Sequence, residues 1–317
     1  MSDRSNNNGR GYEYACLHTL QNHINKERPA IIVENSSYYA AEHAWNMFTV
    51  GEQSLYKISA EAAIQSLFGL EPRIIEQGFT PVELYIQQDT NGVSGDVRDI
   101  IIQRQDISWQ IGISVKHNHF AVKHSRLSPS IDFGESWYGY PCSRTYWKAV
   151  TPIFEYLRQA HAESIYFRDL LNKANDIYVP LLQAFMSEIN RQYAKHKDLP
   201  KKLVEYLLCK YDFYKWISID THRITQLQAY NLHGTLNQAS RIATPDIIIP
   251  KTALPKRIIS FGFYPNRSNT LLLCMDNGWA FTFRIHNAEE ICTPSLKFDV
   301  QIIGVPTTII SINCPWN

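Results

Sequence analysis

The sequence offers little that would indicate a membrane protein, a disulfide framework or a zinc site. Its six cysteines are scattered along 317 residues without a Cys-x-x-Cys pair, so we expect free thiols. No uninterrupted apolar run approaches the roughly 18 residues that a membrane span needs. The polar start Met1–Tyr14 lacks the apolar centre of a signal peptide. We therefore expect a soluble, cytoplasmic protein with no membrane partner.

A strong net charge is also missing, because the formal charge is only +1. A nucleic-acid partner would therefore require basic residues gathered on one face. Two tracts lack Asp and Glu, residues 107–131 and residues 247–275. Such tracts predict positive surfaces suited to phosphate groups, although many charged stretches are only solvated surface.

Hydrophobic periodicity divides the chain into three parts. Residues 1–140 combine apolar residues at helical spacing with short alternating strands. Residues 141–240 carry no glycine before His233 and predict a helical block, and residues 241–317 are rich in strand-forming residues. We expect an α/β protein in which these three parts form one compact unit.

The stretch Ser94–Arg126 is the one around which the rest is organised. It predicts two antiparallel strands, Val97–Arg104 and Ser108–Lys116, with Asp99 directly before an apolar run. Alternate residues of a strand share one face, so Gly112, Ser114 and Lys116 lie together. A helix is expected to restart near Ala121–Leu127, which would place Lys123 and Arg126 on one side of it.

An acid at the head of one strand and a lysine late in the next is the pattern of a metal-dependent phosphodiesterase. The carboxylate holds Mg²⁺, and the ammonium group steadies the attacking water and the developing charge. This setting of Asp99 and Lys116 resembles the PD-(D/E)xK nucleases, in which an acid stands at the position of Ser114. Serine is a poor Mg²⁺ ligand, so the resemblance implies that a second carboxylate comes from another part of the chain. Asp96 and Glu13 are the two alternatives. Taken singly, Asp99 would be a turn acid and Lys116 a solvated edge lysine.

Basic and amide side chains beside these strands are candidates for DNA contacts. His117-Asn118-His119 does not have the spacing of the HNH nuclease motif, so we expect a phosphate contact there, with inert imidazoles as the alternative. Arginine reads guanine and asparagine reads adenine, although both also make structural hydrogen bonds. The expected DNA-binding residues are His117, Asn118, His119, Lys123, His124, Arg126, Arg284 and Asn287.

Several phrases resemble type II restriction endonucleases of the HaeIII family. They are GDVRDI at 95–100, GISVKHNH at 112–119, KHSRL at 123–127, FRIHNA at 283–288 and the opening GYEY at 11–14.

The resemblance implies a restriction-endonuclease-like (PD-(D/E)xK) core with a mixed sheet and flanking helices. Residues 1–140 would then be the nuclease core and residues 241–317 the DNA-recognition part. It also implies a Mg²⁺-dependent bacterial enzyme that cuts double-stranded GGCC to blunt ends, with a cognate methyltransferase as its functional partner. The expected catalytic residues are Asp99, Lys116, Ser114, Asp96 and Glu13, with Asp99, Asp96 and Glu13 as metal ligands.

A palindromic target favours a homodimer. Two other functions stay open at this point. One is a structure-specific or repair nuclease on the same core. The other is a non-catalytic DNA-binding protein, which the missing acid at Ser114 favours.

Overall fold

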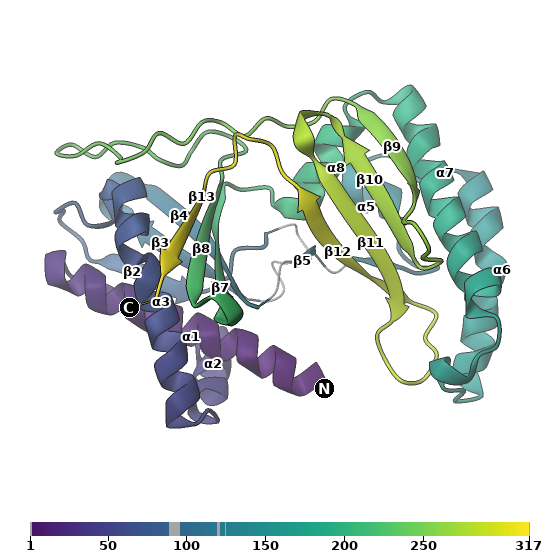
Figure 1. Ribbon diagram of the computed structural model, residues 1–317, viewed down its shortest axis with the longest axis horizontal. Coiled ribbons are helices and arrows are strands. Elements are labelled where there is room, and N and C mark those ends of the chain that lie inside the picture. The colour runs from purple at the N-terminus through teal and green to yellow at the C-terminus, as the bar shows by residue number, and fades with distance from the viewer. Residues whose placement is uncertain (1, 89–95, 119–120, 124, 317) are drawn as a thin grey trace. The chain divides into compact units, whose positions relative to one another are not determined.

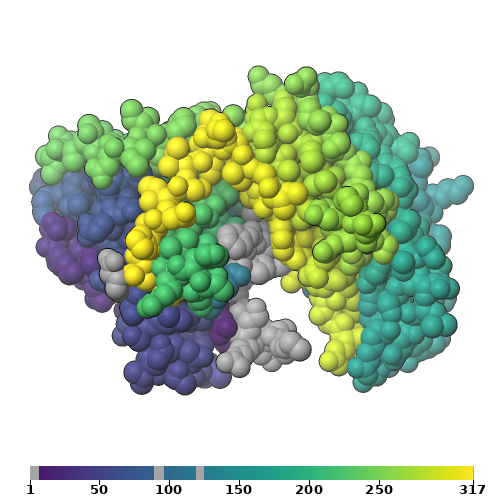
Figure 2. All heavy atoms as spheres, in the orientation of Figure 1, coloured from purple at the N-terminus to yellow at the C-terminus, as the bar shows by residue number. Residues whose placement is uncertain are grey.

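The computed structural model describes residues 2–88, 96–118, 121–123 and 125–316. The chain forms two compact units (Figures 1 and 2), each assembled from segments that are distant in sequence. Unit 1 contains Met1–Phe120, Cys209–Thr252 and Thr308–Asn317, and unit 2 contains Ala121–Leu208 and Ala253–Thr307. These units do not follow the divisions near residues 140 and 240 that the sequence predicts, because the chain passes from one unit to the other and back. The expected α/β class is confirmed.

Unit 1 is built on a seven-stranded mixed sheet with the order β1-β2-β3-β4-β7-β8-β13. Its strands are β1 (Ala30–Ile32), β2 (Val82–Ile86), β3 (Ile100–Arg104), β4 (Trp109–His117), β7 (Phe213–Ile219), β8 (Ile224–Tyr230) and β13 (Ser311–Pro315). Its helices include α1 (Ser2–Glu27), α2 (Ser36–Asn46) and α3 (Val50–Leu70). The pairs β1/β2 and β4/β7 are parallel, and the other neighbouring pairs are antiparallel.

One face of this sheet is apolar and packs against α1 and α3. Ile113 and Trp216 from the sheet are fully buried with Leu17 of α1 and Ile64 of α3. The alternating burial of β2 matches the period of two in its sequence. Burial of apolar surface at about 25 cal/mol per Å² is the main stabilising contribution here. The opposite face of the sheet remains available for polar side chains.

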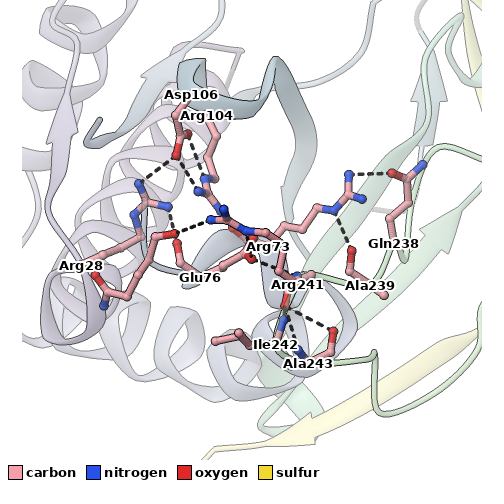
Figure 3. Close-up of polar contacts among 12 residues, drawn as sticks. Arg28, Arg73, Glu76, Arg104, Asp106, Gln238, Ala239, Arg241, Ile242 and Ala243 are labelled. Carbon is pink, nitrogen blue, oxygen red and sulfur yellow. Dashed lines mark hydrogen bonds and ion pairs between the residues drawn. The ribbon is translucent and has the colours of Figure 1, made fainter. Parts of the chain in front are cut away.

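A buried network of charged groups closes the end of this sheet (Figure 3). Arg104 at the end of β3 is fully buried, and its guanidinium lies 2.8 Å from Asp106 and 3.3 Å from Glu76. Glu76 also accepts from Arg241 at 2.9 Å, and Arg28, directly after α1, joins the same cluster. Because each buried charge has an opposite partner, removing one would leave another uncompensated.

Unit 2 is built on a six-stranded sheet with the order β5-β12-β11-β10-β9, and β6 also pairs with β12. Its strands are β5 (Ala121–Lys123), β6 (Arg126–Leu127), β9 (Ile258–Phe263), β10 (Thr270–Met275), β11 (Ala280–Asn287) and β12 (Leu296–Gly304). Its helices are α5 (Phe133–Tyr138), α6 (Arg144–Ala162), α7 (Val179–Lys195) and α8 (Leu199–Leu208).

Aromatic rings hold the helices of unit 2 to one face of its sheet. The ring of Phe185 on α7 lies 5.9 Å from Phe283 on β11 and 5.0 Å from Phe298 on β12. Trp137 of α5 lies 5.3 Å from the same Phe185 ring. Figure 1 shows α5 and α8 behind this sheet, so the face toward the viewer is the one that the helices leave uncovered.

Several expectations from the sequence agree with these elements. Apolar residues at helical spacing predict a helix from about residue 11, which lies within α1. The glycine at position 69 before Pro72 predicts a helix end that matches α3, and the alternation at 82–86 predicts the strand β2. Ser36 and Ser37 are plausible caps for α2 by residue type, but the cap is Asn35, whose side chain accepts from the amide of Tyr38. The apolar residues at 308–312 predict a strand, which the structure has three residues later as β13.

Two expectations are wrong. Residues 121–123 and 126–127 form the strands β5 and β6 instead of a helix, since they pair with β12. The glycine-free block was expected to be helical to residue 232, but β7 and β8 occupy residues 213–230. The turn between these strands takes its left-handed position from Arg223, at φ 49°. Glycine is the usual residue at a left-handed turn position, so a turn that uses arginine there cannot be recognised from a glycine in the sequence.

None of the helices in the described ranges is both long and apolar enough to cross a membrane.

Glu71 generates a prediction about pH and stability. This buried carboxyl accepts from the Tyr214 hydroxyl at 2.8 Å, and burial raises its pKa to about 7. Between its ordinary pKa near 4.5 and pH 7 the folded state therefore binds more protons than the unfolded state. Glu71 consequently lowers stability as pH rises through that window.

At pH 8 we expect Glu71→Gln to have a free energy of unfolding higher than that of the unmodified protein by on the order of 2 kcal/mol, and so to unfold at a higher temperature. At pH 4 the difference should be much smaller, because the wild-type carboxyl is then protonated. Thermal unfolding followed by circular dichroism at both values measures this. A difference that does not depend on pH would contradict the assignment.

Candidate active site

Asp99 lies directly before β3, and three donors converge on one of its carboxylate oxygens. Oδ2 accepts from Lys116 Nζ at 2.9 Å, from the Val115 backbone amide at 2.7 Å and from Ser114 Oγ at 3.2 Å. In the described part of the chain, Oδ1 of Asp99 has no hydrogen-bond partner. The donors therefore fix the carboxylate and leave one oxygen for another ligand.

The pairing of β3 with β4 produces this arrangement. The last paired residues of the two strands are Ile100 and Ile113. The amide of Asp99, the residue before Ile100, also donates to the carbonyl of Ile113. Ser114 and Lys116 are two residues apart on β4 and so share the face toward Asp99. The predicted meeting of Asp99, Ser114 and Lys116 on one face is thus found in the structure.

The ion pair between Asp99 and Lys116 is accessible. Their side chains are 23% and 27% exposed, so the pair itself contributes about 1 kcal/mol or less to stability. Burial of Lys116 opposes its charged form, but attraction from Asp99 and from Glu13 outweighs this and raises the pKa of Lys116. The lysine is therefore a permanent cation at neutral pH.

Glu13 on α1 belongs to the same electrostatic environment. Its charge acts on Lys116, and the charges of Glu13 and Asp99 both act on the buried thiol of Cys16, whose pKa is raised mainly by burial. Glu13 also lines a small cavity together with Ser36, Ser37 and Gln88. The expectation that a glutamate of the first helix faces this site is consistent with these interactions.

Asp96 has a different environment. Its two oxygens accept from Nε and Nη2 of Arg98 at 2.8 and 2.7 Å, and the pair is buried. Burial acts to raise the pKa of Asp96, but Arg98 outweighs it and holds the pKa below its usual range. The stem of Arg98 lies over Gly112, where an added Cβ would come within 2.0 Å of Arg98 Cδ. Asp96 is therefore engaged with Arg98 in place of a metal.

His117 and Asn118 are held by Asp220, a residue that sequence reasoning missed. His117 Nε2 lies 2.9 Å from Asp220 Oδ2, and the same oxygen accepts from Asn118 Nδ2 at 2.9 Å. Asn118 Oδ1 accepts from the amide of Asp220, also at 2.9 Å. These contacts fix the end of β4 and occupy the groups that were expected to bind phosphate.

Lys215 on β7 is a second residue that the sequence did not reveal, because its strand was interpreted as a helix. It is paired with Ser114 across β4 and β7 and is only 4% exposed. Burial and repulsion from Lys116 lower the pKa of Lys215 to about 7, and attraction from Asp99 opposes this. A second amine therefore lies on the catalytic face of the sheet.

The same face of the sheet carries a row of amide side chains on the strands that follow β7. Tyr230 donates to Gln228, Gln228 donates to Gln226 and Gln226 donates to Asn313, at 3.1, 2.8 and 2.9 Å. The row crosses β8 and β13, whose pairing places Asn313 beside Gln226. The face that carries Asp99 is therefore polar over several strands.

Arg126 and Lys297 form a basic pair in unit 2. They lie opposite each other on β6 and β12, and Arg126 also contacts Ser295 at 3.4 Å. Burial and the charge of Arg126 lower the pKa of Lys297. Like charges placed side by side are unfavourable unless an anion joins them, which supports the expected role of Arg126. His119, His124 and the side chain of Lys123 lie outside the described residues.

Arg284 and Asn287, both on β11, differ in what they can offer to a ligand. Arg284 is half exposed and lies 3.2 Å from Asp299 of the neighbouring strand β12. Asn287 donates to the carbonyls of Glu289 and Ile291 and accepts from the hydroxyl of Thr293. The amide of Asn287 is therefore occupied in holding this loop.

The donor set around Asp99 suits a hard cation that binds oxygen. Mg²⁺ in phosphoryl-transfer sites uses one or two carboxylates, with water and phosphate completing its six ligands. Asp99 and Glu13 could supply two such carboxylates. Among the described residues no cluster of three or more His, Cys, Asp or Glu is arranged to hold a metal.

Comparison with known proteins identifies the family of the chain. The model of the HaeIII restriction endonuclease family matches residues 9–306. The chain is 49% identical over 317 residues to the "Type II restriction enzyme HaeIII" of Haemophilus aegyptius, covering 100% of this chain and 99% of that protein. No solved structure matches the chain significantly. The resemblance seen in the sequence is confirmed, and the chain belongs to the HaeIII restriction endonuclease family.

Proposed function

We propose that this protein is a Mg²⁺-dependent type II restriction endonuclease that hydrolyses double-stranded DNA at GGCC and leaves blunt ends. The proposed catalytic role rests mainly on one observation: Ser114, Val115 and Lys116 all donate hydrogen bonds to one oxygen of Asp99. The full-length similarity to the HaeIII enzyme supports the class of target. The mixed sheet, with acid and lysine on neighbouring strands, supports a PD-(D/E)xK core.

Asp99 and Glu13 would hold the metal, which when bound supplies a positive charge and activates water. Lys116 remains charged and would stabilise the negative charge that develops on the phosphate in the transition state. The Ser114 hydroxyl donates to Asp99, so its role would be to orient the carboxylate. Ser114 would then orient Asp99 from the position at which related nucleases carry an acid.

The target also implies partners. A palindrome presents the same surface twice, which favours a homodimer with twofold symmetry. The chromosome of the host would need protection by a methyltransferase of the same specificity, so we infer a functional partner of that kind in the cytoplasm of a bacterium. The alternative of a non-catalytic DNA-binding protein is supported by the missing acid at Ser114.

Lys116→Ala tests the catalytic role of the lysine. We expect cleavage to slow by at least about 100-fold, because one group that stabilises the transition state is lost. Binding to a GGCC duplex in Ca²⁺, which should permit binding without hydrolysis, should change far less. Single-turnover cleavage and fluorescence anisotropy measure the two effects. Lys26→Ala, at the exposed end of α1, is the matched control, and cleavage by Lys116→Ala at the wild-type rate would refute the role.

Glu13→Gln and Asp96→Asn separate the two candidates for the second carboxylate. Glu13→Gln should fold normally and require much more Mg²⁺ for cleavage, since it removes a ligand charge. Asp96→Asn should instead lower the unfolding temperature, because it leaves buried Arg98 without its counterion, at a cost of about 3–5 kcal/mol. Mg²⁺ titrations of cleavage, together with thermal melts, measure both. An unchanged Mg²⁺ requirement in Glu13→Gln would exclude it as a ligand.

Digestion of one sequenced plasmid separates the possible functions. We expect discrete fragments with blunt ends at every GGCC site in the presence of Mg²⁺, and none at sites methylated by an enzyme of the same specificity. Sequencing of the fragment ends provides the measurement. A smear, or cutting only at branched junctions, would indicate a nuclease that reads DNA shape, and binding with no cleavage would indicate the non-catalytic alternative.

A further inference from the structure

The polar face of the unit 2 sheet contains a cavity of about 370 Å³ that has no part in the catalytic arrangement. It lies over β10, β11 and β12, on the side opposite the aromatic rings that pack against the helices. This is the surface that Figure 2 shows in yellow-green. The cavity is lined by Tyr264, Arg267, Thr270, Thr282, Arg284, Asp299, Gln301 and Ile303.

Strand pairing places the charged residues at the centre of this cavity. Thr270, Arg284 and Asp299 are directly opposite one another on the three strands, so their side chains share a face. Thr282 and Gln301 form the neighbouring row on the same strands. The positions are on the backbone of a regular sheet, which holds side chains more precisely than a loop does.

Asp299 has a hydrogen-bonding group that its surroundings do not satisfy. Its side chain is only 11% exposed, and Oδ2 accepts from Arg284 Nη2 at 3.2 Å. Its other oxygen, Oδ1, is buried and has no hydrogen-bond partner among the described residues. An unsatisfied buried acceptor costs about 1–3 kcal/mol, so a hydrogen-bond donor supplied by a ligand would recover part of that cost.

The combination of charges argues against a phosphate in this cavity. The cavity is lined by two arginines, Arg267 and Arg284, which would attract a phosphate group, but the carboxylate of Asp299 beside Arg284 would repel it from the centre. The edge of a base pair is neutral and offers both acceptors and donors. In the major groove guanine presents O6 and N7 as acceptors, and its partner cytosine presents an N4 amino donor. Arginine with two donors and a carboxylate with a vacant acceptor match this pattern.

We propose that Arg284 and Asp299 form a base-reading site for a guanine–cytosine pair of the target, in which Arg284 donates to guanine and Asp299 accepts from cytosine. The proposal rests on the endonuclease function proposed above and assigns part of its sequence specificity. It also explains why Arg284 is half exposed although a counterion holds it. The paired carboxylate orients the guanidinium before DNA arrives, which reduces the entropy lost on binding.

Arg284→Lys tests the site while keeping its charge. Lysine cannot form the two parallel hydrogen bonds of a guanidinium. We expect affinity for a GGCC duplex in Ca²⁺ to fall about 10- to 100-fold, while affinity for a duplex of equal length without GGCC changes less than about threefold. Asp299→Asn, which keeps an oxygen for Arg284, should weaken binding to the GGCC duplex by at least about fivefold.

A modified duplex identifies the contacted atom. Replacing the guanines of GGCC by 7-deazaguanine removes N7 and should weaken binding by the unmodified protein. It should weaken binding by Arg284→Lys much less, because the interaction is already lost and the two changes are therefore not additive. Arg158→Lys is the matched control, since Arg158 pairs with Glu155 on an exposed helix of the same unit. Thermal melts check that each variant is folded.

The outcomes distinguish failure of the base-reading site from failure of the proposed endonuclease function. Equal weakening on both duplexes would mean a phosphate contact and would overturn base reading. Unchanged preference for GGCC in folded Arg284→Lys would overturn base reading alone and leave the nuclease function intact. A wild-type protein that binds every duplex equally would overturn the proposed specific function and the base-reading site together.

Discussion

The pairing register of β3 and β4 is the constraint on which the candidate active site depends. Asp99 and Ile113 are joined by a backbone hydrogen bond of 2.8 Å, and this fixes Asp99 opposite the row of Ser114 and Lys116. A shift of one residue would turn the lysine to the apolar face that packs against the helices. The apolar side chains of that face exclude such a shift, so the packing of the core also determines the geometry of the site.

The two sheets use the same division of faces. In each unit helices cover an apolar face, and the opposite face carries polar groups, some of which we propose to act on DNA. In unit 1 these are Asp99, Lys116, Lys215 and the amide row, and in unit 2 they are Arg284 and Asp299. A period of two in the strands produces this division. Stability and function thus come from alternate residues of the same strands.

Charge pairing decides which of the polar groups remain available to a ligand. Asp96 and Asn287 were candidates by residue type, yet Arg98 binds the first and a loop engages the second. His117 is held by Asp220, which is 103 residues away in sequence. Asp99 and Asp299 differ from these, because each has one oxygen bound by a basic residue and a second oxygen without a partner in the described chain. That asymmetry is the common feature of the two proposed sites.

The sequence alone determined the α/β class, the family and the meeting of Asp99, Ser114 and Lys116. The meeting of these three residues follows from a local pattern, since β3 and β4 are joined by residues 105–108 alone and form a hairpin whose faces alternate. The sequence did not reveal β7 and β8, because an aromatic, glycine-free segment with a turn at Arg223 has no local signal that separates strand from helix. Lys215 and Asp220 reach the site only through the parallel pairing of β4 with β7. Such contacts between distant segments are set by the burial of apolar faces across the whole unit, and only the tertiary structure decided them.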